Sequence, residues 1–210
     1  PSSSMEPTLL IGDRIFVSKY TYGFSKHSFP FSPNLTNKRF FYKSPEPGDL
    51  VVFKTPVDNR TDYIKRLIGL PGDEVQFING DIFINNEKII RKKIDTFESV
   101  RCGKLSFDVS AYQETLPNGS KHIAVYNKDG TLQNTAKFIV PEKHFFLLGD
   151  NRDCSSDSRY LDNVGYVNFL NLVGKAQIIF FSNDTRKSSL LKIWNLNNSF
   201  RTDRLFKKIK

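Results

Sequence analysis

The stretch VQFINGDIFI, residues 75–84, is typical of a β-hairpin. Apolar and polar residues largely alternate on both sides of Asn79 and Gly80, a pair that readily adopts the two positive-φ positions of a type I′ turn. Alternation at strand period also marks GDLVVFK (48–54) and DYIKRLIGL (62–70), while few stretches keep a helical period. The sequence therefore predicts a mostly β protein built from antiparallel sheets.

The alternating pattern fades between residues 85 and 137, where charged and turn-rich runs replace it. It returns in FIVPEKHFFLLGDNRD (138–153) and in VGKAQIIFF (173–181), and a polar, basic end follows. We expect a main core from residues 1–79 and 141–185, an inserted smaller β-rich subdomain at 80–140 and a basic C-terminal tail at 186–210.

The composition is that of a globular chain, with 39% hydrophobic and 25% charged residues among 210. No apolar run reaches the roughly 18 residues that a membrane helix needs. The formal charge of +9 could serve nucleic acid or anionic lipid, but a solvated basic surface is its commonest meaning. The chain begins with Pro1 and not with methionine, so we expect that preceding residues, including any signal or membrane anchor, are missing.

Metal and triad chemistry find little support in the residue pattern. The three histidines stand without a GxSxG elbow, and neither HExxH spacing nor a calcium-loop pattern occurs, so we expect no metal and no cofactor. The two cysteines are too few for a disulfide framework and lack CxxC spacing. Because Cys102 lies in the expected insertion and Cys154 in a polar loop, we expect both to be free thiols.

A serine can instead be activated by a neutral lysine, and Lys65 is placed for that role inside the largely apolar strand YIKRLIGLPGD (63–73). Burial would have to lower the lysine pKa from about 10.4 to between about 7 and 8, at a cost of about 4 kcal/mol. The neighbouring Arg60 and Arg66 cannot serve, because a guanidinium stays charged. A lone strand lysine more often extends its amine to solvent.

Three segments in order resemble the motifs of bacterial type I signal peptidases: PSSSMEPTLLIGD (1–13), YIKRLIGLPGD (63–73) and GDNRDCSSDSR (149–159). These are membrane-anchored serine-lysine proteases that remove signal peptides from exported preproteins. The resemblance extends from residue 1 to about 80 and from about 140 to 181. It implies the catalytic core that signal peptidases share with self-cleaving repressors. Singly, the segments also read as a flexible end, a surface lysine and a turn-rich loop.

The resemblance implies a role for each polar residue of these motifs. Ser4 would be the nucleophile and Lys65 the general base. The Ser4 backbone N–H and the Ser2 hydroxyl would form the oxyanion hole, and Ser155 would orient the lysine. Asp157 and Arg159 would be structural charges.

The resemblance also implies shallow pockets for small side chains at the first and third positions before the cut. The residues expected near the first position are Met5, Leu9, Tyr63 and Ile64, and those near the third are Ile15, Val52 and Asp62. Plain core packing is the competing interpretation of the apolar ones.

The implied partners are preprotein signal peptides and a membrane lipid surface, with no nucleic acid, and the chain is expected to be a monomer. The implied location is the bacterial cytoplasmic membrane, with the catalytic domain on its outer, periplasmic side. The aromatic stretch YTYGFSKHSFPFSP (20–33) suits contact with an anionic membrane, although its rings could equally fill the core.

Two rival interpretations remain. A self-cleaving repressor of the same serine-lysine fold would have a cleavable linker before the nucleophile and would lack GDNRDCSSDSR. A non-catalytic basic β-domain that binds nucleic acid would explain the charge but not the serines and the lysine.

Overall fold

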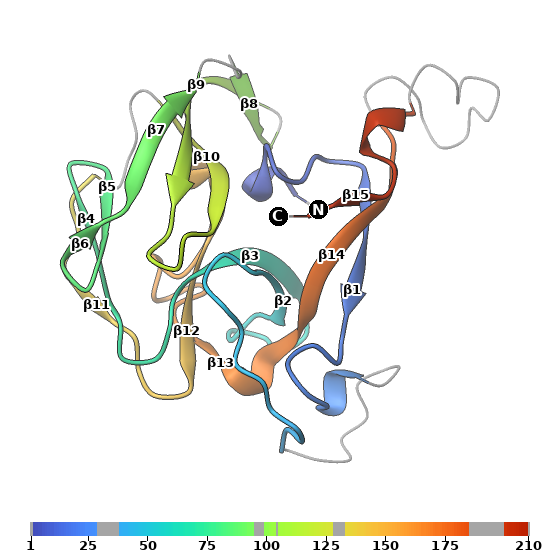
Figure 1. Ribbon diagram of the computed structural model, residues 1–210, viewed down its shortest axis with the longest axis vertical. Helices are drawn as coiled ribbons and strands as arrows, with labels where there is room; N and C mark the ends of the chain where they lie inside the picture. Colours follow the sequence, from blue (N-terminus) through green and yellow to red (C-terminus); the bar gives the residue numbers. More distant parts are fainter. Residues whose placement is uncertain are drawn as a thin grey trace.

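Strands dominate the computed structural model, which describes residues 2–28, 38–94, 99–103, 105–127, 133–184 and 200–209 (Figure 1). Pairings between the strands of this part are antiparallel, and its helices are single 3-10 turns. These turns are η1 (Ser3–Met5), η2 (Lys26–Ser28), η3 (Arg152–Cys154), η4 (Phe169–Asn171) and η6 (Thr202–Arg204). The prediction of a mostly β, antiparallel fold is confirmed.

A seven-stranded sheet forms the centre of the molecule, in the order β1-β14-β2-β3-β12-β13, with β15 paired to β14. Its strands are β1 (Asp13–Ser18), β2 (Leu50–Lys54), β3 (Asp62–Gly69), β12 (His144–Leu148), β13 (Val167–Asn168), β14 (Leu172–Ser182) and β15 (Lys207–Lys208). The second half of β3 is buried, as its apolar run predicts, because β2 and β12 flank it on either side.

Two smaller sheets are formed mostly by the middle of the chain. One contains β7 (Ile90–Ile94), β8 (Ser99–Cys102), β9 (Leu105–Thr115) and β10 (Lys121–Asn127). The other contains β4 (Glu74–Ile78), β5 (Asp81–Ile84), β6 (Glu87–Lys88) and β11 (Phe138–Ile139).

The predicted hairpin at 75–84 is confirmed, since β4 pairs with β5 and both turn residues have positive φ, 50° at Asn79 and 78° at Gly80. The expected domain boundary after residue 79 therefore falls inside this hairpin. The division into a core and an inserted subdomain stays a prediction.

Separate apolar clusters hold these sheets together. The first joins the β4–β5 sheet to the central sheet, with Val75 and Phe77 packed against Phe146 and Leu148. Another lies around Phe53 and Leu67 of the central sheet. A smaller cluster packs the end of η1 and the segment after it onto that sheet; its buried members are Met5, Leu9, Leu50, Ala176 and Ile179. The N-terminal serines are thus anchored directly to the central sheet.

Residues 200–209, part of the expected basic C-terminal tail, pack on the central sheet. β15 pairs with Ile178 and Ile179 of β14, and Figure 1 shows it running along that strand. Arg204 forms a 2.5 Å ion pair with the buried carboxylate of Asp13. Residues 186–199 and 210 of the expected tail lie outside the described residues, as do residues 29–33 of the aromatic stretch.

Across the described ranges, no helix combines the length and the apolar character that a bilayer crossing requires.

Candidate active site

Ser4 and Lys65 meet where η1 packs against β3. The Lys65 amine lies 2.5 Å from the Ser4 hydroxyl oxygen, although 61 positions separate the residues in the chain. Both residues are buried, with exposed fractions of 6% for Ser4 and 3% for Lys65. Met5 anchors η1 from within the small apolar cluster, so the neighbouring serine is held toward the lysine.

The pKa of Lys65 is lowered to about 8, chiefly because burial disfavours the charged amine. Asp157 and Asp150 oppose this shift, and Arg159 reinforces it. The amine also lies 5.5 Å from the centre of the Tyr63 ring. A large part of the protein population therefore has a neutral Lys65 near pH 8, and a neutral amine can accept the proton of the adjacent hydroxyl.

The two other serines expected at the site lie near Ser4 in different ways. The Ser2 hydroxyl oxygen is 3.1 Å from that of Ser4, and Ser2 itself is exposed. The Ser155 hydroxyl is buried close to the Asp157 carboxylate, yet no hydrogen bond of good geometry fixes it, either to that carboxylate or to Lys65.

The loop of residues 149–159, called the Ser155 loop below, approaches the Ser4 segment very closely at Gly149. A Cβ atom at Gly149 would lie 2.2 Å from the Ser155 hydroxyl oxygen and 2.5 Å from the Ser4 carbonyl oxygen. Both distances are shorter than any real Cβ contact, so only glycine fits between the two serine segments.

Asp157 and Arg159 form a buried ion pair within the same loop. The Arg159 Nε donates to Asp157 at 2.8 Å, and the Gly149 N–H donates to the same carboxylate at 3.0 Å. Burial alone would raise the pKa of Asp157, but the Arg159 charge and these hydrogen bonds lower it. The pair stays charged and keeps the loop folded back on Gly149.

The expected pocket residues divide between several surroundings. Met5 and Leu9 are fully buried in the small apolar cluster, with Ile15 and Ile64 packed against it. The Tyr63 ring packs instead against Phe53 of β2, with ring centres 6.2 Å apart. Val52 pairs with Ile64 across β2 and β3, and the exposed Asp62 forms a 2.9 Å ion pair with Lys54. In this structure, Met5 and Leu9 are therefore core residues.

One edge of β3 is open beside the lysine. β2 pairs along one edge from Asp62 to Arg66, whereas β12 pairs along the other edge only from Arg66 onward. In the described part of the chain, no strand covers the outer edge of Asp62, Tyr63 and Ile64. An extended peptide could add to the sheet there, next to Lys65.

Comparison with known proteins identifies the family of the chain. The family model described as "Signal peptidase, peptidase S26" matches residues 1–181. The chain belongs to the signal peptidase family. Its function is that of a signal peptidase I, and it is a serine peptidase. Enzymes of this family are membrane-associated.

Similar signal peptidases I occur in the genus Rickettsia. The protein of Rickettsia typhi is 42% identical over 228 residues, which cover 100% of this chain and 83% of that protein. The protein of Rickettsia akari is 44% identical over 194 residues, covering 87% and 70%. A crystal structure of a signal peptidase I from Enterococcus faecalis is 25% identical and covers 63% of this chain and 97% of that one. Its TM-score is 0.38, so the family assignment depends on the sequence matches.

The expectation of free thiols in this signal peptidase is wrong, because Cys102 and Cys154 form a disulfide. Their Cα atoms are 5.4 Å apart although 52 positions separate them in sequence. The sheet of β7, β8, β9 and β10, called the middle region below, approaches the Ser155 loop through β8. The spacing of the two cysteines in the sequence does not reveal that the fold brings them together.

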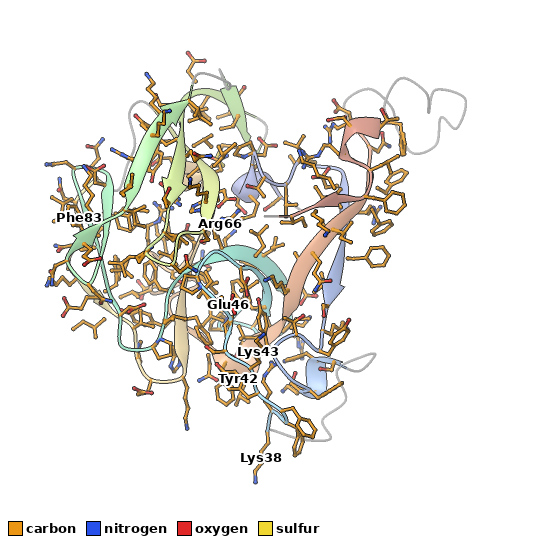
Figure 2. All side chains as sticks on the ribbon, viewed as in Figure 1. Lys38, Tyr42, Lys43, Glu46, Arg66 and Phe83 are labelled. Carbon is orange, nitrogen blue, oxygen red and sulfur yellow. A yellow bond between two sulfur atoms is a disulfide. The ribbon has the colours of Figure 1, made fainter. Side chains whose placement is uncertain are left out.

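Two functional contacts of the signal peptidase were missed from sequence. Asn151 donates from its backbone N–H to the Ser4 carbonyl at 3.1 Å and from its side chain to the Ser3 carbonyl at 3.2 Å. Arg66, near the centre of Figure 2, donates twice to Asp150, each time at 2.7 Å. Asn151 and Asp150 belong to GDNRDCSSDSR. The motif therefore indicated the loop in which they lie but not the residues that they contact.

Proposed function

We propose that this signal peptidase cleaves preprotein signal peptides with Ser4 as nucleophile and Lys65 as general base. The observation that supports this most directly is the 2.5 Å approach of the buried Lys65 amine to the Ser4 hydroxyl. The lysine takes the hydroxyl proton as the Ser4 oxygen attacks the scissile carbonyl, and later gives it to the leaving amine. The lowered pKa of Lys65, about 8, supplies the neutral amine that the first step needs.

The negative charge of the tetrahedral intermediate would be stabilised by the Ser4 backbone N–H and the Ser2 hydroxyl. The position of Ser2, 3.1 Å from the attacking oxygen, supports this role. Each such donor contributes about 3 kcal/mol to the transition state in enzymes of similar chemistry.

Ser155 would orient the Lys65 amine, and Asp157 with Arg159 would hold the loop that presents it. In support, the buried Ser155 hydroxyl lacks a hydrogen bond of good geometry and is thus available to the lysine. This is the part that a third group plays in catalytic triads.

The substrate would bind as an extended strand along the open edge of Asp62, Tyr63 and Ile64. Main-chain hydrogen bonds would hold it there, and small side chains at the first and third positions before the cut would fit shallow pockets. The proposed pocket residues are Met5, Leu9, Tyr63 and Ile64 for the first position and Ile15, Val52 and Asp62 for the third. Because Met5 and Leu9 are fully buried, they would support the pocket from behind its surface.

The experiment that tests the proposal compares the wild type with Ser4→Ala on a preprotein peptide with alanines at the first and third positions. Cleavage should vanish in Ser4→Ala while the far-ultraviolet circular dichroism spectrum stays that of the wild type. Lys88→Arg, an exposed substitution on β6, is the matched control and should cleave normally. Persisting cleavage in Ser4→Ala would exclude Ser4 as the nucleophile.

The catalytic domain would stand on the outer side of the bacterial cytoplasmic membrane and touch its lipid surface. The Cys102–Cys154 disulfide supports the outer side, because disulfides persist in oxidising compartments. Exposed aromatic rings along β1 and the segment after it support the contact; they are Phe16, Tyr20, Phe24, Phe40, Phe41 and Tyr42. Figure 2 shows Tyr42 with Lys38 and Lys43 at the lower end of the molecule, far from Phe83.

Vesicle flotation tests the membrane contact. Anionic vesicles should bind the protein more strongly than neutral ones, and salt should weaken the binding. Phe41→Ser removes a ring that is 88% exposed and should reduce binding, whereas Ile90→Ser on β7 should leave it unchanged. A protein that floats with neither type of vesicle has no such surface.

A further inference from the structure

The disulfide joins the middle region of the chain to the residue that precedes Ser155. Cys102 ends β8, and Cys154 ends the short helix η3. The hydroxyl of Ser3, next to the nucleophile, lies 3.8 Å from the Cys154 sulfur, and β8 contacts η1. In Figure 1, the lower end of β8 points at η1. One covalent bridge therefore touches both segments that bring serines to the active site.

Ser155 has few side-chain restraints of its own. Its hydroxyl is buried but held by no hydrogen bond of good geometry, so the backbone on either side decides where it points. On one side the Asp157–Arg159 ion pair fixes the loop. On the other side the neighbouring residue is the bridged Cys154.

We propose that the middle region positions Ser155 through this bridge, and that Cys102 is therefore a positioning residue for the serine-lysine dyad. The inference rests on the proposed roles of Ser4 and Lys65. It gives β8 and β9 a function in catalysis, although neither strand supplies a residue to the dyad.

Other contacts would keep the middle region docked if the bridge were opened. Arg152 donates to both oxygens of the buried Glu114 of β9, at 3.0 and 2.7 Å. The Asn127 N–H of β10 donates to Asp153 at 2.8 Å. These bonds hold the beginning of η3, so opening the bridge would loosen mainly its end, at Cys154 and Ser155.

A looser loop would change the surroundings of the lysine in a measurable way. Burial keeps the pKa of Lys65 near 8, and the charged groups that act on it are Asp157, Asp150 and Arg159, all in this loop. When water reaches the amine, its pKa rises toward the ordinary value and less neutral base is present at pH 7. Activity then falls at pH 7 and returns at high pH.

The test measures kcat and KM from pH 6 to 10 for the wild type, with and without dithiothreitol, and for the double variant Cys102→Ser/Cys154→Ser. Dithiothreitol gives two electrons and two protons to the bridge, leaves two thiols and becomes a cyclic disulfide. Reduction should lower kcat at pH 7 about tenfold and raise the midpoint of the pH profile by about one pH unit, with KM little changed. The double variant should behave like the reduced enzyme and be insensitive to dithiothreitol.

Two controls separate positioning from folding. Leu105→Ala alters the residue that pairs with Cys102 across the β8–β9 hairpin but keeps the bridge, so its pH midpoint should match the wild type. Reoxidation of the reduced wild type should restore the midpoint, which shows that the fold survived.

An unchanged midpoint and kcat after reduction would overturn the positioning role of Cys102. That result is distinct from failure of the dyad, which would appear as retained activity in Ser4→Ala or Lys65→Arg while the bridge is intact.

Discussion

The candidate active site and the ion-pair network around it both contain buried cationic side chains, but only those of the network are paired with carboxylates. The network consists of three buried arginines, each paired with a buried carboxylate: Arg66 with Asp150, Arg152 with Glu114 and Arg159 with Asp157. Lys65 is as deeply buried, yet its described contacts are the Ser4 hydroxyl and the Tyr63 ring.

This difference separates structural from chemical use of a buried cation. A guanidinium cannot lose its proton in a protein, so its burial requires a carboxylate partner. An amine without such a partner can become neutral instead, and the pKa of Lys65 falls to about 8. The protein thus keeps its arginines charged to hold the loop, whereas Lys65 can become neutral, as its proposed role as general base requires.

Lys65→Arg replaces the one side chain of this group that can become neutral by one that stays charged. Of the changes predicted here, it should have the largest effect on activity. A permanently charged guanidinium cannot take the Ser4 proton, so kcat/KM should fall by about a thousandfold or more. Peptide cleavage under steady-state conditions measures this. Lys175→Arg on β14, where the lysine pairs with Asp49 at 2.5 Å, is the matched control and should cleave at the wild-type rate. Activity within tenfold of wild type in Lys65→Arg would show that another group is the base.

Arg152→Met breaks a structural pair and should act on stability. It leaves Glu114 buried without its cation, which should lower the free energy of unfolding by about 3–5 kcal/mol. Urea unfolding measures the loss, and adding Glu114→Gln should recover part of it. Lys137→Met removes one partner of an exposed pair with Glu74 and should cost less than about 1 kcal/mol. Equal losses in the two variants would contradict the distinction between buried and exposed pairs.

The pH dependence of stability offers a smaller but sharper comparison. Between pH 8 and 10.5 the unfolded chain holds a proton on Lys65 that the folded chain has lost, so the folded state gains stability as pH rises. The unfolding free energy of the wild type, minus that of Lys65→Met, should therefore rise by about 3 kcal/mol across this window. Urea unfolding at a series of pH values gives the difference. A flat or falling difference would mean that Lys65 is not buried as a neutral amine.

What could be predicted from sequence was local. The hairpin at 75–84 follows from alternation and from the Asn79-Gly80 turn, whereas the apolar strand around Lys65 left open whether its amine is buried or reaches solvent. Each of the three motifs can be recognised because it is a pattern of several neighbouring residues. The segments that they mark meet in space. Each of these predictions depends on residues that lie within about a dozen positions of one another in the chain.

What could not be predicted depends on partners far away in the chain. The Cys102–Cys154 bridge closes over 52 residues, and no spacing rule applies to one pair of cysteines. The sequence predicts only a basic C-terminal tail at 186–210, yet Arg204 is buried against Asp13. Asn151 donates to the Ser3 carbonyl from its side chain and to the Ser4 carbonyl from its backbone, and its motif reveals neither partner.

The ion pair of Arg204 with Asp13 has a consequence for the order in which the protein is made. The two residues stand 191 positions apart, and Arg204 also donates to the Thr8 carbonyl, four residues after Ser4. A ribosome therefore makes the Ser4 segment well before Arg204, which braces it from 191 positions further along the chain. Until Arg204 has emerged, the Ser4 segment lacks this brace, so the newly made protease gains its complete site only after that later segment has been made.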